Sequence, residues 1–418
     1  MRTDAQVSVL LISDVDEGGA AIACQRVYLE LNRRMGDRCK WAVASGIRHA
    51  GVVNGGKWPS FPALVTYEVR RRVFKNERAV ARAEHSFNAV NIGKIVHRLN
   101  PKLIYLYNIH QRMAFDLVNV FPKDSAIVIS LQDMWYLTGY CCYSMGCEKY
   151  RTGCKGICPQ WKKWEIPTRA ADEEWRRRQA YYLENAHRIY VTAPSKWMAK
   201  CAEDRFKGAI RVEHIPNAVD TSVFRPLGAK REIRQLLGFE PDRPLVLCGA
   251  VRMDDERKGA RYLREALARL KQRFGAAFTV AVFGASADGG AIPDAVGLGA
   301  IREERLLNLY YNAATVFVLP SLAESFGLVF AEAMAAGTPC VAFDTTACSE
   351  LVRKGETGYL AELSDADSLA AALVRALEAG DNNPLSHSCR EHAVAEYDVR
   401  VVGEQHLRVI EHALGERN

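Results

Sequence analysis

Short apolar runs rich in β-branched residues alternate with longer amphipathic stretches along almost the whole sequence. Such runs occupy residues 7–12, 104–107, 126–129, 189–191, 245–248, 278–283 and 316–319. Parallel strands need a long crossover between them, usually a helix, so this alternation predicts parallel sheets covered by helices. The fold class is therefore expected to be α/β.

The length of the chain and one polar linker predict two domains. A chain of 418 residues suffices for two domains of roughly 100–200 residues that each bury a core. The segment 215–226 holds two prolines among polar residues, as linkers do. We expect one domain over 1–216 and another over 217–418, with the last helix a candidate to pack back on the first. Both halves show the same alternation, so two doubly wound, Rossmann-like domains facing each other across a cleft are the economical architecture.

Net charge differs between the two halves. Residues 1–216 carry 34 Lys and Arg against 21 Asp and Glu, a net +13, whereas the remainder carries 22 against 28, a net −6. A basic half predicts an anionic partner, such as a phosphate, a nucleic acid or a membrane surface. The excess is concentrated at 70–82, where six Lys and Arg stand between apolar residues. If helical, this segment could lie on an anionic membrane, and a solvated helix face is the alternative.

Neither a membrane span nor a signal peptide is expected. No apolar run approaches the roughly 18 residues that a spanning helix needs, and the first run, at 7–12, is too short for a signal-peptide core. We therefore expect a cytoplasmic protein, with peripheral contact at the inner face of the cell membrane as an option.

A strand, a turn of small residues and a helix follow one another within residues 316–339. Apolar residues at helical spacing predict the helix over about 326–336, and a Gly and a Pro at 337–339 would end it. Its N-terminus would bind an anion, because first-turn amides lack partners within the helix and the helix dipole is positive there. A helix end simply capped by Ser325 or Glu324 is the alternative.

Four charged residues in the second half have the chemistry of a nucleotide-sugar site. Glu324 and Glu332 stand before the predicted helix and about two turns inside it. The first carboxylate could face a group held over the helix N-terminus, and the second could accept two vicinal hydroxyls. Arg252 and Lys258 follow the run at 245–248 and suit a diphosphate. Two solvated surface cations beside acidic residues would look the same in sequence.

Taken together, these residues resemble the retaining GT-B glycosyltransferases of family 4, also called group 1. The resemblance spans nearly the whole chain and rests on residues 17–19, 194–197, 215–224, 252–259, 320–339 and 350–358. Within the family, the branch of colanic-acid and other exopolysaccharide transferases is indicated by Asp133-Met134-Trp135, Thr138-Gly139 and the cysteine-rich segment that follows.

The resemblance implies roles for the donor-side residues. Arg252 and Lys258 would hold the donor diphosphate and stabilise the charge that develops on it. Glu332 would take the ribose hydroxyls, and Glu324 would contact the donor sugar. The turn and its amides would cradle the phosphates at Ser325, Phe326, Gly327, Leu328 and Val329.

The resemblance also implies the reaction. A hexose would pass from a UDP- or GDP-sugar to a polysaccharide or lipid-linked oligosaccharide, with retained anomeric configuration and no essential metal or cofactor. In the first domain, Gly18 and Gly19 would let a loop approach donor and acceptor closely. Asp133 lies in the implied acceptor cleft, and His110 would line the same cleft, unless it is an ordinary loop histidine.

Two departures from the family pattern put full activity in doubt. The branch usually shows a His before Asp-Met-Trp, where this chain has Gln132. Relatives show a Gly-Gly turn where this chain has Thr346 and Ala347, which could alter the pocket for the donor sugar. A catalytically impaired scaffold is therefore an alternative.

A cysteine-rich insert at about 138–160 predicts a metal site. The cysteines stand in the spacing C-x4-C-x6-C-x3-C and are Cys142, Cys147, Cys154 and Cys158. Four thiolates so close together suit a structural zinc ion, although two disulfides or reduced thiols remain alternatives. A zinc-containing nucleic-acid-binding protein is a further alternative, but it leaves the pattern at 320–339 unexplained.

Overall fold

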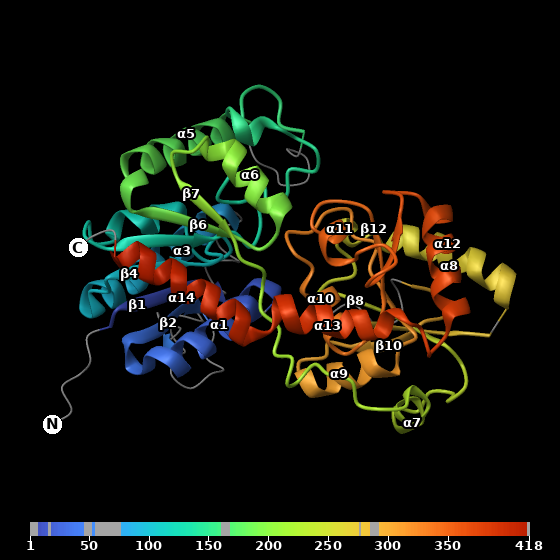
Figure 1. Ribbon diagram of the computed structural model, residues 1–418. Helices are drawn as coiled ribbons and strands as arrows, with labels where there is room; N and C mark the ends of the chain where they lie inside the picture. The colour runs from blue at the N-terminus through green and yellow to red at the C-terminus, as the bar shows by residue number, and fades with distance from the viewer. Residues whose placement is uncertain are drawn as a thin grey trace. The chain divides into compact units, whose positions relative to one another are not determined.

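The computed structural model describes residues 7–15, 18–45, 52–54, 77–159, 168–275, 277–284 and 292–415. The chain forms two compact units, each built on one parallel sheet (Figure 1). The first unit comprises Met1–Pro194, Met198–Ile215 and Gly403–Asn418, and the second comprises Ser195–Trp197 and Pro216–Val402. The predicted α/β class is confirmed.

The sheet of the first unit has seven strands in the order β3-β2-β1-β4-β5-β6-β7, and every neighbouring pair is parallel. The strands are β1 (Val9–Val15), β2 (Cys39–Ser45), β3 (Val52–Asn54), β4 (Leu103–Leu106), β5 (Ala126–Ser130), β6 (Ile189–Ala193) and β7 (Arg211–His214). The central strands β4, β5 and β6 are buried throughout, as expected of a parallel sheet covered by helices. The main helices of this unit are α1 (Gly19–Met35), α3 (Glu77–Leu99), α5 (Thr168–Glu184) and α6 (Lys196–Phe206).

The sheet of the second unit has six strands in the order β10-β9-β8-β11-β12-β13, again all parallel. The strands are β8 (Leu245–Gly249), β9 (Thr279–Phe283), β10 (Val296–Gly299), β11 (Val316–Val318), β12 (Cys340–Phe343) and β13 (Gly358–Ala361). The helices are α7 (Lys230–Leu236), α8 (Ala260–Phe274), α9 (Glu304–Ala313), α10 (Leu328–Ala335), α11 (Cys348–Leu351), α12 (Ala366–Ala379) and α13 (Leu385–Tyr397).

The order of strands reverses once in each sheet, between β1 and β4 and between β8 and β11. In sheets of this kind, ligands bind at the carboxyl ends of the strands beside such a reversal, because the loops there diverge and leave room. The loops after β1 and β4, and those after β8 and β11, are therefore where each unit is expected to carry its functional residues.

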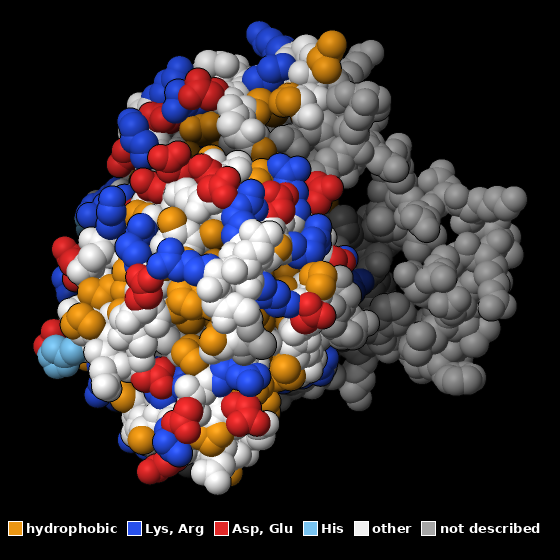
Figure 2. Space-filling view, turned by 90° about the vertical axis from the view of Figure 1, so that its right-hand side faces the viewer, with side chains coloured by type: hydrophobic (Ala, Val, Ile, Leu, Met, Phe, Trp, Pro, Cys, Tyr) orange, Lys and Arg blue, Asp and Glu red, His pale blue; other side chains and the backbone are white. Residues whose placement is uncertain are grey.

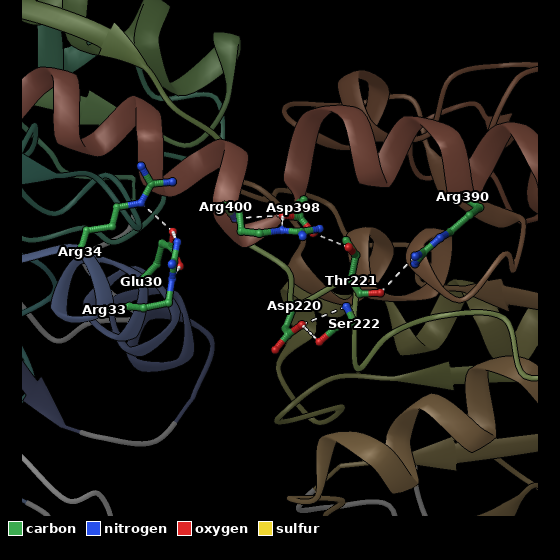
Figure 3. Close-up of polar contacts among 9 residues, drawn as sticks. All are labelled: Glu30, Arg33, Arg34, Asp220, Thr221, Ser222, Arg390, Asp398 and Arg400. Atoms are coloured by element: carbon green, nitrogen blue, oxygen red, sulfur yellow. Dashed lines mark hydrogen bonds and ion pairs between the residues drawn. The ribbon is translucent and has the colours of Figure 1, made fainter.

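The last helix, α14 (Val399–Gly415), ends within the first unit and packs closely on α1. A Cβ atom on Gly403 would lie 2.4 Å from Cγ of Glu30, so only glycine allows this approach. Glu30 itself is held on α1 by Arg33 and Arg34 (Figure 3). Further along α14, Nδ1 of the buried His406 lies 2.5 Å from the hydroxyl of Tyr105 on β4.

The start of α14 is fixed to the second unit through the polar segment at its beginning. The hydroxyl of Thr221 donates to the carboxylate of Asp398, which also pairs with Arg400 at 2.8 Å (Figure 3). Arg390 of α13 donates to the carbonyl oxygen of Thr221 at 3.1 Å. The segment predicted as a linker, 215–226, is irregular and is anchored in this way rather than loose.

Within the described residues, no helix is both long and apolar enough to cross a bilayer. Most of the basic segment predicted to contact a membrane, 70–76, lies outside the described residues. Its remainder, 77–82, forms the start of α3.

Candidate functional site

Two loops at the carboxyl ends of adjacent strands, β8 and β11, are joined in the second unit. The amide of Leu322 donates to the carbonyl oxygen of Arg257 at 2.7 Å. Gly259 has a φ of +69° and lies so close to the other loop that a Cβ atom there would be 1.9 Å from the carbonyl oxygen of Pro320. This approach places the cations at 257 and 258 beside the turn that precedes α10.

Glu324 lies at the centre of this arrangement, only 5% exposed. Its Oε1 is 2.6 Å from Nζ of Lys258 and accepts from the hydroxyl of Ser321 at 2.8 Å. Its Oε2 is 3.3 Å from Nη1 of Arg257. Burial alone would raise the pKa of Glu324, but the two cations outweigh it and hold the pKa at about 2. The carboxylate therefore stays ionised. Arg257 also pairs with Asp255 at 3.3 Å, so two cations and two carboxylates meet in this cluster.

The predicted helix after this turn is present as α10, but it begins two residues later than expected. Gly327 precedes its first residue with a φ of +98°, which favours glycine. Phe326 and Gly327 therefore belong to the turn, and Leu328 and Val329 open the helix. Ser325 lies in the same turn and is buried. The amides of Leu328 and Val329 lie in the first turn of α10, where helix amides lack partners within the helix.

Glu332 lies in the second turn of α10 and is 4% exposed. Its Oε2 accepts a hydrogen bond from the hydroxyl of Tyr311 at 3.3 Å. Tyr311 comes from α9 and is fully buried. The carboxylate is thus oriented by a residue that the sequence did not single out.

Arg252 does not join this cluster. It follows β8 as expected, but its guanidinium pairs with Asp254 at 2.6 Å and its side chain is 71% exposed. The cation that accompanies Lys258 is instead Arg257, which also donates to the carbonyl oxygen of Ala323 at 2.7 Å. Sequence position alone could not decide between the two arginines, because the choice depends on which way each side chain points.

In the first unit, two loops bring His110 and Asp133 together. They follow β4 and β5, and Nε2 of His110 lies 2.8 Å from Oδ2 of Asp133. Burial alone would lower the pKa of His110, but the carboxylate of Asp133 outweighs it and raises the pKa well above its usual value. Asp14, at the end of β1, accepts from the amide of Gln111 at 2.9 Å, and burial raises its pKa to about 6.

The two glycines predicted to approach a ligand open helix α1. Gly18 precedes the helix with a φ of +88°, and Gly19 is its first residue. A Cβ atom on either glycine would meet nothing within 4 Å. The space over this helix start is therefore open within the described residues, as close approach of a ligand would require.

Three of the predicted zinc ligands, Cys147, Cys154 and Cys158, interact with one another or with Cys141, and all four predicted ligands lie in the described part of the chain. Sγ of Cys142 lies 3.6 Å from Nε2 of His110 and forms a group with His110 and Asp133 instead. Burial first, and then the thiols of Cys158, Cys154, Cys147 and Cys142, raise the pKa of Cys141 to about 12. None of these cysteines forms a disulfide.

Comparison with known proteins points to one class of enzyme. The sequence model of the family described as "Glycosyl transferases group 1" matches residues 243–379 of this chain. An alpha-maltose-1-phosphate synthase of Mycobacterium tuberculosis is 26% identical over 354 residues, which cover 78% of this chain and 89% of that protein. A phosphatidyl-myo-inositol mannosyltransferase of Mycolicibacterium smegmatis is 34% identical over 222 residues, covering 48% of this chain and 52% of that protein.

Solved structures share the fold over almost the full length. Sucrose-phosphate synthase of Thermosynechococcus elongatus has a TM-score of 0.69 at 20% identity, covering 98% of this chain and 99% of that one. Anabaena HepE, solved with UDP and glucose, has a TM-score of 0.64 at 16% identity, covering 97% of this chain and 99% of that one. The family match, the relatives and the shared fold show that the chain is a glycosyltransferase of the GT-B fold, with its group 1 domain in the second unit.

Proposed function

We propose that the protein is a retaining, family 4 hexosyltransferase. It transfers a hexose from a UDP- or GDP-sugar to a polysaccharide or lipid-linked oligosaccharide during exopolysaccharide biosynthesis. The bond between the anomeric carbon and the diphosphate oxygen breaks, and the acceptor hydroxyl attacks from the same face, so the configuration is retained. The proton of the hydroxyl leaves with the diphosphate.

One observation carries this proposal: a buried carboxylate with two cations stands beside the start of α10. Lys258 and Arg257 both pair with Glu324, and Arg257 pairs with Asp255 as well. The ammonium and the guanidinium, together with the first-turn amides of α10, are donors that suit a diphosphate. Lys258 would stabilise the negative charge that grows on the diphosphate as it departs.

Glu332 supplies the second contact of the donor. Its carboxylate is already oriented by Tyr311, so it could accept the two ribose hydroxyls without losing much side-chain freedom on binding. Arg252 would reach the donor only after leaving Asp254, which an exposed arginine can do at little cost.

The relatives support a nucleotide sugar as the donor. They also support a glycan, or a lipid-linked glycan, as the acceptor. HepE was solved with UDP-glucose, and the relative from Mycolicibacterium smegmatis is named a phosphatidyl-myo-inositol mannosyltransferase. We place the acceptor side in the first unit at His110, Asp133, Gly18 and Gly19. We further propose a cytoplasmic enzyme that contacts the inner face of the membrane through the basic segment 70–82.

Nucleic-acid binding finds no support on the face drawn in Figure 2. That face is the right-hand side of Figure 1, and acidic and basic side chains are interspersed on it. A nucleic-acid interface would need a continuous basic surface.

The proposal is tested by calorimetric titration of the full chain with UDP and GDP, followed by UDP- and GDP-hexoses. One nucleotide series should bind in the micromolar range. Glu332→Ala should weaken binding of the free nucleotide and the sugar nucleotide alike, by on the order of 1–3 kcal/mol, because a hydroxyl pair loses its acceptor. The anomer formed with an acceptor glycan, read by NMR, tests retention.

Glu391→Ala is the matched control, because this glutamate lies on α13 of the same unit with its side chain 67% exposed. It should bind nucleotide as the wild type does. Failure of the wild type to bind any of these nucleotides would overturn the proposal, and so would equal weakening in both variants.

A further inference from the structure

Three different ligand atoms converge on one point in the first unit. Nε2 of His110 lies 2.8 Å from Oδ2 of Asp133 and 3.6 Å from Sγ of Cys142. All three atoms lie within 4.8 Å of one another. A nitrogen, an oxygen and a sulfur from three separate loop positions thus share one small space.

The contacts do not form a proton relay. A relay through histidine uses both ring nitrogens, one toward the acid and one toward the nucleophile. Here the carboxylate and the thiol both face the same nitrogen, Nε2. One nitrogen carries at most one proton and can serve only one of the two partners well. A cation between the three atoms would satisfy all of them.

The surrounding residues hold these side chains in place. Oδ1 of Asp133 accepts from the amide of Trp135 at 2.8 Å, and Oδ2 accepts from the side-chain amide of Asn108 at 3.1 Å. The ring of His110 lies against Trp135, with 5.5 Å between ring centroids. Such outer contacts are typical of metal ligands, whose orientation they fix.

Asn108 adds an independent observation. It is more than nine-tenths buried, and its Oδ1 has no hydrogen-bond partner in the described structure. A buried amide oxygen without a partner costs free energy unless a further group, such as a metal-bound water, comes within its reach.

The ligand set selects the kind of ion. Magnesium and calcium prefer oxygen ligands, whereas imidazole and thiolate favour zinc and similar metals. Bond lengths of about 2.3 Å to sulfur and about 2.0–2.1 Å to nitrogen put tetrahedral zinc ligands roughly 3.2–3.7 Å apart. The separation of 3.6 Å between sulfur and nitrogen fits, and the 2.8 Å between nitrogen and oxygen would have to widen by a few tenths of an ångström.

We propose that His110, Asp133 and Cys142 form a binding site for a thiophilic divalent cation of the zinc type. Three protein ligands leave one tetrahedral position open for water. This site uses none of the donor residues around Glu324, and it shares His110 and Asp133 with the proposed acceptor side.

The test is a cobalt titration of the full chain after treatment with a chelator. Cobalt(II) occupies zinc sites, and its bond to a thiolate gives a charge-transfer absorption in the near ultraviolet. The wild type should bind one equivalent with this band, and zinc should displace it. Cys142→Ser should lose the band, and Asp133→Asn should weaken binding at least about tenfold.

Cys141→Ser is the matched control, because it removes the neighbouring thiol and leaves the proposed ligands in place. It should keep the band. A band that survives in Cys142→Ser but disappears in Cys141→Ser would overturn the proposal and assign the metal to the thiols at 141, 147, 154 and 158. Absence of cobalt binding in a folded wild type, verified by circular dichroism, would also overturn it. Because the readout is absorption, failure here is distinct from failure of sugar transfer.

Discussion

The ammonium of Lys258 lies 2.6 Å from the carboxylate of Glu324, although the two residues are 66 positions apart in the sequence. Both side chains are largely buried, with 15% and 7% of their surfaces exposed. The pair therefore links the loop after β8 to the turn before α10 and sets the charge of the proposed donor site.

Neutralising Glu324 should destabilise the protein. Glu324→Gln would leave the buried Lys258 without its carboxylate and Arg257 with Asp255 alone, and breaking a buried pair costs about 3–5 kcal/mol. We expect a loss of this size in the free energy of unfolding, measured with urea. Glu356→Gln, whose exposed carboxylate lies 3.7 Å from Arg353, should change it by less than about 1 kcal/mol. Similar losses in both variants would contradict the role given to the buried pair.

Lys258→Ala should slow turnover more than it weakens donor binding. The ammonium meets the full charge of the diphosphate only as the sugar departs, so its contribution grows toward the transition state. We expect kcat to fall by about 100-fold or more, with a smaller rise in the Kd of the nucleotide sugar measured by calorimetry. An equal loss in both quantities would reject this role.

Gly259→Ala should disrupt the donor site through the backbone. A Cβ atom there would lie 1.9 Å from the carbonyl oxygen of Pro320, in addition to the strain at φ +69°. Gly275 ends the same helix, α8, with a φ of +61° and open space around it. Both variants should lose on the order of 1–3 kcal/mol of stability, because L residues rarely adopt the positive φ of either position. Gly259→Ala should lose more because of its clash, and only Gly259→Ala should also lose nucleotide affinity. Unchanged affinity in Gly259→Ala would show that the contact between the loops is dispensable.

His406 should make stability fall in acid. Burial lowers its pKa from 6.5 to about 3 in the folded protein, so below pH 6.5 only the unfolded chain takes up the proton. The contribution of the neutral His406 to the free energy of unfolding is therefore fully present above pH 6.5. It is lost progressively as the pH falls from 6.5 toward 3. In urea unfolding at several pH values, His406→Gln should be less stable by on the order of 1 kcal/mol at pH 7, with a shallower loss in acid. If the free energy of unfolding changes with pH in the same way in the wild type and in His406→Gln, the lowered pKa of His406 does not contribute to the acid sensitivity.

Gln132→His should not raise activity. Gln132 is buried, and its side-chain amide donates a hydrogen bond to the hydroxyl of Ser130 at 3.0 Å. The surrounding residues therefore already fit a glutamine at this position. An imidazole has a different shape and would disturb this contact, with an expected stability loss on the order of 1 kcal/mol. Higher kcat in the variant would instead show that the site merely lacks a helpful histidine.

Seven strands were predictable from apolar runs, but the mostly buried β2 and β12 and the exposed edge strands were not. All seven predicted runs are strands, because a strand covered on both faces must be apolar throughout. Strands β7 and β10 are largely exposed edge strands, so no apolar run marks them. β12 is fully buried but has only four residues directly after a proline.

Positions at strand ends were also predictable, but side-chain directions were not. Lys258 and Glu324 could be placed together because both follow central strands of one sheet. The contact of Tyr311 with Glu332 depends on the rotation of one helix against another, on which a single sequence carries no signal. For the same reason the sequence did not show that Cys142 lies beside His110.

The two-part make-up of the first unit sets an order of events during synthesis. This unit starts at the N-terminus but includes Gly403–Asn418, so the ribosome makes the whole of the second unit before the first can be finished. Until α14 emerges, Tyr105 lacks His406, and α1 lacks the helix that packs over Glu30. The unit that begins first on the ribosome is therefore the one completed last.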